Sequence, residues 1–207
     1  MTNKTQKVVL ITIVSLLFLS LVGCNSQGNP EDAVDNFFNY AKSFKLNSIA
    51  NTFEDLDNDS EEMFEDISEE KDFPDYLLEY LKENAKEIEY KITNTEKENN
   101  VAVVTVEVKY IDGGGVISES FGEVFRTILT ESSGGEDLSD EYLDELFEEI
   151  MKEKQSLNKE KIIEKEIIIN LVESRGKWYI EEMTDELADI IMSGFIKAMD
   201  NIGSNIN

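Results

Sequence analysis

The sequence contains no histidine, one cysteine and few basic residues. Without histidine, the chain lacks the commonest general base, the Ser-His nucleophile pair and most ligand sets for zinc or haem. A single cysteine excludes an intrachain disulfide and a thiolate metal cluster. Only 19 basic residues oppose 45 acids, for a net charge of −26. That balance excludes a general nucleic-acid binder, which needs a basic surface to neutralise phosphates.

The sequence does contain enough apolar residues for a folded domain. Its 207 residues are 41% apolar and 31% charged, which is typical of a globular chain and not of a disordered one. At about 100–200 residues per domain, the length allows one domain, or one domain with a tail.

The N-terminus has the features of a secretory signal peptide. Lys4 and Lys7 precede an apolar run over residues 8–22 that only hydroxyl-bearing residues interrupt. The run has 15 residues, whereas a membrane-spanning helix needs about 20 and the core of a signal peptide about 7–15. We therefore expect residues 1–23 to be a signal peptide that is removed.

The end of this run, Leu21-Val22-Gly23-Cys24, resembles the lipobox of bacterial lipoproteins. The resemblance implies that the Cys24 thiol takes a diacylglyceryl group and that a signal peptidase cuts between Gly23 and Cys24. Two acyl chains hold a protein stably on a bilayer, at about 0.8 kcal/mol per buried methylene. The alternative is a free buried cysteine behind an uncleaved membrane helix. We favour a lipid anchor at the extracytoplasmic face of the cell membrane, with residues 24–29 as a short tether.

The mature chain is expected to be strongly acidic. Loss of residues 1–23 removes two lysines and no acid, leaving 17 bases, 45 acids and a net charge of −28 over 184 residues. Such a charge repels anionic lipid headgroups and wall polymers, so we expect the domain to stand off the surface. We interpret the charge as a source of solubility in a cation-rich exterior, in preference to a dedicated cation store.

Helices are predicted for the first part of the mature chain. An asparagine cap precedes a helix that begins at Pro30, and a second, shorter helix follows from Leu46. Residues 54–72 are mostly acidic, and we expect a loop there with one short helix capped by Ser60. Pro74 opens the next helix.

After the third helix, the spacing of apolar residues changes from the helical period to every second residue. Residues 88–92 and 104–110 alternate apolar and polar side chains, and the sequence ENN at 98–100 has the composition of a turn. This pattern predicts a β-hairpin. The glycines at 113–115 end it, and we interpret them as a flexible connector because they lack the context of a phosphate loop.

Residues 117–157 are predicted to form a helical insert. Apolar residues recur at helical spacing in two stretches, separated by a loop at the glycines 134–135. Ser139 caps the second helix, with Leu138 and Leu143 placed to form a hydrophobic staple.

A second strand pair and a last helix complete the pattern. Residues 167–171 alternate again, and after a glycine-containing turn the next strand starts at Trp178. Thr184 caps one last helix, whose apolar stripe extends to Ile202. Helices set apart from antiparallel strands predict a single α+β domain over residues 30–207.

Three segments carry a fold resemblance. They are the Phe37-Phe38 pair in the first helix, the hairpin EIEYKITNTEKENNVAVVTVEVKYID and the strand pair IIINLVESRGKWYIEE. Over residues 30–182 they resemble the nuclear transport factor 2-like, or cystatin-like, cone and, more narrowly, small Gram-positive lipoproteins of unknown function that carry it. The resemblance implies N-terminal helices packed on a curved antiparallel sheet around a conical pocket, with the helical insert and a C-terminal helix. It implies no substrate.

One acidic stretch has the spacing of a calcium loop. Asp55, Asp57 and Asp59 stand at i, i+2 and i+4, with Asp66 at position 12. Position 6 is Ser60 where the loop needs glycine, and an aspartate at position 12 is short for bidentate binding. We interpret the stretch as a solvated acidic loop, and keep weak surface calcium binding as an alternative.

Carboxylates are the remaining candidates for acid–base catalysis. Isomerases with a cone fold use an aspartate base and a tyrosine donor. Here Glu107 and Glu166 fall in strands, on the outer face or beside a lysine, and Tyr40, Tyr80 and Tyr110 fall near apolar stripes, where the ring belongs to the core and the hydroxyl to its rim. The predicted core stripes contain no acid, so desolvation that would raise a carboxyl pKa to neutrality is not evident.

The sequence therefore predicts a binding or interaction module that does not catalyse. We expect no catalytic residue, cofactor or metal, and an unknown small ligand or a cell-envelope protein as partner. Trp178 is expected to anchor the core of the last hairpin, with a pocket wall as the alternative. The competing function is an anchored enzyme that uses a pocket carboxylate in isomerase-like chemistry.

Overall fold

The fold is α+β, as the sequence predicts. The computed structural model describes residues 28–56, 58–68, 73–131, 139–157 and 160–205. Over these ranges the chain forms eight helices and one four-stranded antiparallel sheet. The expected signal peptide, Gly23, Cys24 and the first residues of the tether lie outside the described residues.

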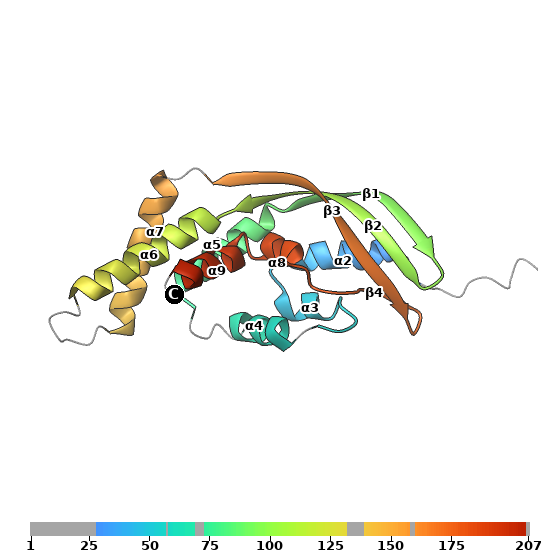
Figure 1. Ribbon diagram of the computed structural model, residues 1–207, viewed down its shortest axis with the longest axis horizontal. Helices are drawn as coiled ribbons and strands as arrows, with labels where there is room; N and C mark the ends of the chain where they lie inside the picture. The colour runs from blue at the N-terminus through green and yellow to red at the C-terminus, as the bar shows by residue number, and fades with distance from the viewer. Residues whose placement is uncertain (1–27, 57, 69–72, 132–138, 158–159, 206–207) are drawn as a thin grey trace, which may run out of the picture.

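The elements follow the predicted order. The helices are α2 (Pro30–Lys42), α3 (Leu46–Ala50), α4 (Asn58–Ser68), α5 (Asp75–Lys86), α6 (Gly114–Glu131), α7 (Asp140–Leu157), α8 (Asp185–Ile191) and α9 (Phe195–Asn205). The strands are β1 (Glu89–Glu98), β2 (Val101–Asp112), β3 (Lys161–Ser174) and β4 (Lys177–Ile180). Figure 1 shows the sheet as one long, curved layer with helices on one face.

The sheet is an antiparallel meander in the order β1-β2-β3-β4. The hairpin of β1 and β2 confirms the sequence prediction, with Glu98 and Val101 paired across the turn. β3 begins at Lys161, six residues before the predicted alternation at 167. It is longer than predicted because it pairs with β2 as far as Asp112, the partner of Lys161. Period-2 alternation directs every second side chain of β2, such as Val104 and Val106, into the core.

The core lies between the inner face of the sheet and the helices α2, α5 and α8. Phe37 and Phe38 of α2 are fully buried, with their rings edge to face at a centroid distance of 5.1 Å. Leu81 of α5 and Ile169 of β3 are buried as well. Each such side chain contributes about 1.5–3 kcal/mol through burial, so apolar packing holds the helices to the sheet.

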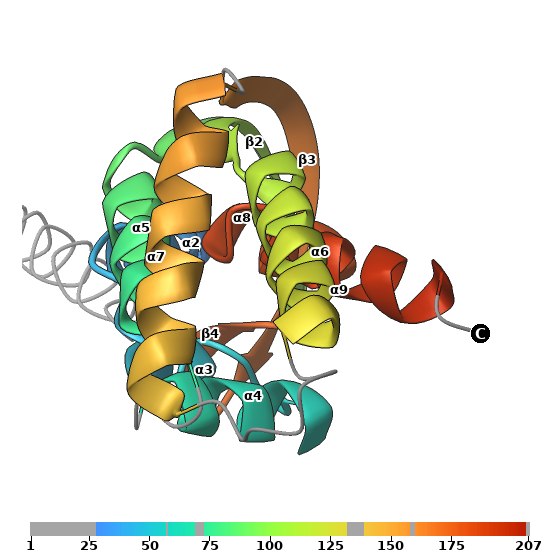
Figure 2. The ribbon, with the colours of Figure 1, turned by 90° about the vertical axis from the view of Figure 1, so that its left-hand side faces the viewer.

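The predicted helical insert is present and begins earlier than expected. Figure 2 shows α6 and α7 side by side at one end of the molecule. The Ser139 cap is confirmed, since its Oγ accepts the Tyr142 backbone N–H at 3.2 Å, whereas Leu138 of the expected staple lies outside the described residues. The glycines were wrongly interpreted as a connector: α6 starts at Gly114, whose N–H donates to Asp112 Oδ1 at 2.9 Å.

After Thr184 the sequence predicts one last helix, whereas the structure has two, α8 and α9. Thr184 caps α8 as expected, because its side chain accepts the Leu187 N–H at 3.2 Å. The chain then leaves the helix through two left-handed residues, Ser193 at φ 52° and Gly194 at φ 79°, before α9 begins. Apolar residues keep their helical spacing on both sides of this break, so the sequence pattern does not predict it.

Candidate functional site

The structure describes part of the acidic stretch over residues 54–72. α4 covers most of it, so Ser60 lies inside the helix and does not cap it, which corrects the prediction. Asp55 precedes α4, and Asp59 lies within it. Asp57 lies outside the described residues. Among those that are described, no group of three or more acidic or cysteine side chains is placed to hold a metal ion.

A buried carboxylate occupies the junction of α8 and α9, where the sequence predicted none. Asp189 is 3% exposed and is the one buried acid among the described residues. Lys197 of α9 donates from Nζ to Asp189 Oδ2, and this hydrogen bond raises the pKa of the Lys197 ammonium. Asp189 sits within a run of apolar neighbours, which was the only sign in the sequence that it could be buried.

Hydrogen bonds tie this junction to the rest of the core. The Ser193 hydroxyl accepts from Asn84 Nδ2 at 2.9 Å and donates to the carbonyl of Ile111 at 2.5 Å. The backbone carbonyl of Ser193 accepts the Gly113 N–H at 2.8 Å. One residue thus joins α5, the end of β2 and the start of α9, which indicates a structural role for the polar groups here.

The buried tyrosines are poor acid–base catalysts near neutral pH. Burial raises the pKa of Tyr80 and of Tyr110 to about 12, and the charge of Asp189 adds to the shift at Tyr110. The Tyr80 hydroxyl is buried without a well-formed hydrogen bond to a described residue, so the expectation that it lies at the rim is wrong. Tyr90 also has a pKa raised to about 12, through burial and its hydrogen bond to Asp35.

These shifts predict alkaline destabilisation. Free tyrosine titrates near pH 10 in the unfolded chain, so the native state binds protons that the unfolded state loses between about pH 10 and 12. The stabilisation is complete below pH 10 and disappears as the pH rises to 12, at about 2 kcal/mol for each of Tyr80 and Tyr110. Denaturant unfolding followed by circular dichroism at pH 8–12 measures it. Tyr110→Phe should flatten the decline, and an equally steep decline in that variant would contradict this assignment.

Three adjoining grooves surround the corner between α2 and α3. The first, of about 330 Å³, and the third, of about 410 Å³, share Phe44 and Lys82, and the first also shares Ser48 with the fourth, of about 270 Å³. We call these three grooves together the α3 band. A second groove of about 450 Å³ lies apart from them, on the outer face of the sheet. None of these four grooves is lined by Asp189, so the buried carboxylate is not placed to meet a ligand bound in them.

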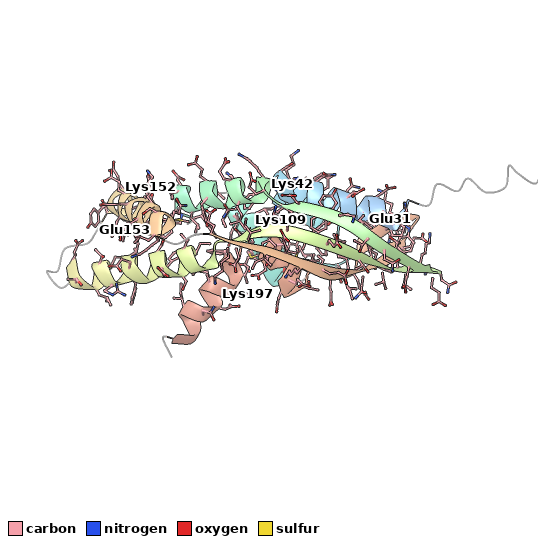
Figure 3. The ribbon with its side chains drawn as sticks, turned by 90° about the horizontal axis from the view of Figure 1, so that it is seen from above. Glu31, Lys42, Lys109, Lys152, Glu153 and Lys197 are labelled. Carbon is pink, nitrogen blue, oxygen red and sulfur yellow. The ribbon has the colours of Figure 1, made fainter. Side chains whose placement is uncertain are left out.

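The α3 band reverses the charge balance of the chain. Five lysines and three acids line it, whereas the whole sequence has 19 basic and 45 acidic residues. The lysines come from α2, the α2–α3 turn, α5 and β4; they are Lys42, Lys45, Lys82, Lys86 and Lys177. Figure 3 shows Lys42 at the meeting of α2 and α5, beyond the opposite long edge of the sheet from Lys197. Among these four grooves, those of the band together have more lysines than acids, which favours an anion over a cation.

Phe44 occupies a backbone position that normally belongs to glycine. α2 ends in a Schellman motif, in which the Phe44 N–H donates to the Ala41 carbonyl at 2.9 Å and the Lys45 N–H to the Tyr40 carbonyl at 3.0 Å. Phe44 has φ 50°, which costs a residue with a Cβ about 1–2 kcal/mol. Its side chain forms a wall of two grooves of the band. A strained residue at a groove is typical of sites where side-chain placement matters more than stability.

Trp178 fulfils both of the roles considered for it. It is 6% exposed and packs in the core, and it also lines the fourth groove together with Tyr40, Asn51 and Tyr179. Lys97 Nζ stands 4.7 Å from the centre of its ring. The indole Nε1 is buried without a hydrogen-bond partner among the described residues.

The two strand glutamates lie on the outer face of the sheet, as predicted. Glu107 and Glu166 are exposed partners across β2 and β3, and Lys91 stands 3.6 Å from the carboxylate of Glu107. Both line the second groove, which is open to water. Nothing in their surroundings favours acid–base catalysis.

Comparisons with known proteins identify no relative. No family model, curated protein or solved structure matches the chain. None of the described helices combines the length and apolarity that crossing a membrane requires. The interpretation of this chain therefore rests on its own residues.

Proposed function

We propose that this chain is a lipid-anchored lipoprotein of the extracytoplasmic membrane face, whose domain binds a ligand without catalysing its conversion. The anchor rests on the sequence: a basic start, a 15-residue apolar run and the only cysteine at the end of Leu21-Val22-Gly23-Cys24. The first described helix, α2, begins toward the end of the molecule opposite α6 and α7 (Figure 1). A bilayer anchor there leaves the helical insert facing away from the membrane.

The nuclear transport factor 2-like cone is part of this proposal. N-terminal helices packed on the inner face of a curved four-stranded antiparallel sheet support it, as does a helical pair between β2 and β3. The inner face is occupied by large side chains such as Phe37, Leu81 and Ile169. We therefore propose that the ligand binds in grooves outside this packed core.

The observation that carries the binding function is the α3 band. It gathers lysines, amides, hydroxyls and aromatic rings from four elements around three connected grooves. Pockets that bind small ligands combine apolar walls with a few convergent polar groups in the same way. Catalysis has no comparable support, because Asp189 forms an ion pair with Lys197 away from the four grooves and the phenol pKa values lie far above neutrality.

Anchorage is tested by Cys24→Ser. Because the thioether can form only on the cysteine thiol, the variant should leave the membrane fraction or accumulate as the precursor with residues 1–23 attached. Fractionation and immunoblotting of the producing cells measure this, with Asn25→Ser as a control that adds the same side chain one position later. A Cys24→Ser variant that is processed and retained like the parent would contradict the lipid anchor.

Binding without turnover is tested with cell extract and wall fragments. The purified chain is incubated with each, and retained small molecules are then identified by mass spectrometry and followed over time. We expect one retained compound that is recovered unchanged. Conversion of a compound that stops on replacement of a single Asp, Glu or Tyr, with folding intact, would establish the enzyme in place of the binding module.

A further inference from the structure

We propose that the fourth groove of the α3 band binds a short extended peptide, which pairs through its backbone with the open edge of β4 at Trp178. This inference rests on the proposed binding function and specifies its ligand. The groove has a volume of about 270 Å³. Its walls come from α2, from α3 and the two residues that follow it, and from β4.

The edge of β4 that faces away from β3 is already paired at one residue. Ile180 donates its backbone N–H to the Thr52 carbonyl at 2.9 Å, and its own carbonyl accepts the Glu54 N–H at 3.2 Å. The two bonds form a parallel bridge between Ile180 and Phe53. A short extended segment of this chain therefore already binds to this edge through its backbone.

The same edge is unpaired at Trp178, two residues earlier in β4. Because alternate residues of a strand direct their backbone groups to the same edge, the Trp178 N–H and carbonyl point away from β3, as those of Ile180 do. Neither group has a hydrogen-bond partner among the described residues, although Trp178 is only 6% exposed. Thr52 and Trp178 both line the fourth groove, so the groove lies along this edge. A buried donor and acceptor without partners are rare in a folded chain, and a ligand in the groove would satisfy both.

A peptide matches this pair of backbone groups. One extended residue presents its N–H and its carbonyl to the same side, so it can donate to the Trp178 carbonyl and accept from the Trp178 N–H. An isolated amide cannot make both bonds, because its N–H and C=O point in opposite directions. Residues 52–54 occupy the edge at Ile180, so the peptide extends from Trp178 toward Lys177.

The charge of the groove sets the direction of the peptide. Among the described residues that line it there is no carboxylate, and Lys177 is the one charged side chain. Lys177 is exposed and has no ion-pair partner among the described residues. A peptide antiparallel to β4 brings its terminal carboxylate to the Lys177 end, whereas a parallel peptide brings its ammonium there. The lysine therefore favours the antiparallel direction and a free C-terminus.

The side walls of the groove add contacts for the side chains of the peptide. Tyr40 of α2 and Tyr179 of β4 are half-buried, so part of each ring is open to an occupant. Asn36, one turn before Tyr40, is exposed and supplies an amide. Partly apolar walls with a few polar groups are typical of sites for small ligands.

The test is a titration of the full chain, held in neutral phosphatidylcholine nanodiscs, with trialanine. Trp178 is the only tryptophan of the sequence, so its fluorescence reports an occupant of the groove. We expect a saturable change with trialanine. Methylation of the central amide nitrogen should weaken binding at least tenfold, because it removes the N–H that pairs with the Trp178 carbonyl. Equal affinities of the two peptides would overturn the backbone pairing.

A lysine variant tests the direction of the peptide. Lys177→Gln should weaken trialanine at least fivefold and leave trialanine amide, which lacks the carboxylate, within twofold. Lys161→Gln, which makes the same charge change at an exposed residue of β3, should alter trialanine less than twofold. Equal losses of trialanine in the two variants would overturn the contact with Lys177.

A second pair of variants tests the location of the peptide. Asn36→Phe fills the groove from α2 and should abolish binding of trialanine. Asn39→Phe makes the same change at an exposed residue of α2 outside the lining and should alter the affinity less than twofold. Both variants should unfold like the parent, and equal affinities in them would overturn this location. Retention of a non-peptide compound from extract, with trialanine unbound, would refute the peptide and leave the binding function standing, whereas no retained compound at all would refute both.

Discussion

Replacing Trp178 with alanine is expected to lower the free energy of unfolding by about 3–5 kcal/mol, the range for emptying a large aromatic core site. Trp178 lies in β4, which contacts α2, and is 94% buried, so its truncation leaves a cavity in the core. The contact of Lys97 with the ring is lost as well. Chemical denaturation of the parent and the variant measures the difference.

Trp178→Phe is the matched control for this site. Phenylalanine retains most of the ring volume and has no N–H, and the indole Nε1 has no hydrogen-bond partner among the described residues. The loss should therefore fall to less than half that of the alanine variant. If Trp178→Ala unfolds like the parent but no longer retains a ligand, the residue serves the fourth groove alone and its place in the core is wrong.

Gly194→Ala is expected to destabilise the domain by about 2–4 kcal/mol. Gly194 has φ 79°, where a Cβ costs about 1–2 kcal/mol, and that Cβ would stand 2.3 Å from Asp112 Oδ1. The carboxylate has to move, and its hydrogen bond to the Gly114 N–H at the start of α6 is lost, at about 1 kcal/mol. Thermal and denaturant unfolding measure the total.

Gly176 provides the matched control for this prediction. It has φ 81° in the β3–β4 turn, and a Cβ there meets nothing within 4 Å. Gly176→Ala therefore carries the backbone strain without the collision, and should cost about 1–2 kcal/mol. Equal effects of the two substitutions would show that the junction of α8 and α9 absorbs the extra atom, and that Asp112 does not depend on Gly194.

The regular elements were predictable because local periodicity determines them. The alternation around Val104 and Ile169 predicts the strands, and the capping residues Ser139 and Thr184 predict where two helices begin. The break at Ser193 was not predictable. Its left-handed conformation is maintained by long-range hydrogen bonds to Asn84 and Ile111, which no pattern within the segment contains.

The candidate site was largely invisible in the sequence for the same reason. Its lysines belong to three elements and one turn and lie up to 135 positions apart, between Lys42 and Lys177, so only the fold reveals that they gather. Asp189 was missed because its ion-pair partner, Lys197, lies beyond the unpredicted break between α8 and α9. Cys24 is the opposite case, since the lipobox is a contiguous motif that sequence alone can indicate.

Native mass spectrometry of the chain, released from the membranes of its own host in mild detergent, tests the central claim most directly. The account predicts a polypeptide that begins at Cys24, carries covalent diacylglyceryl on that residue, and retains one small non-covalent molecule that is released unchanged on activation in the gas phase. A polypeptide that still contains residues 1–23 with an unmodified Cys24, and that releases no ligand, would contradict it.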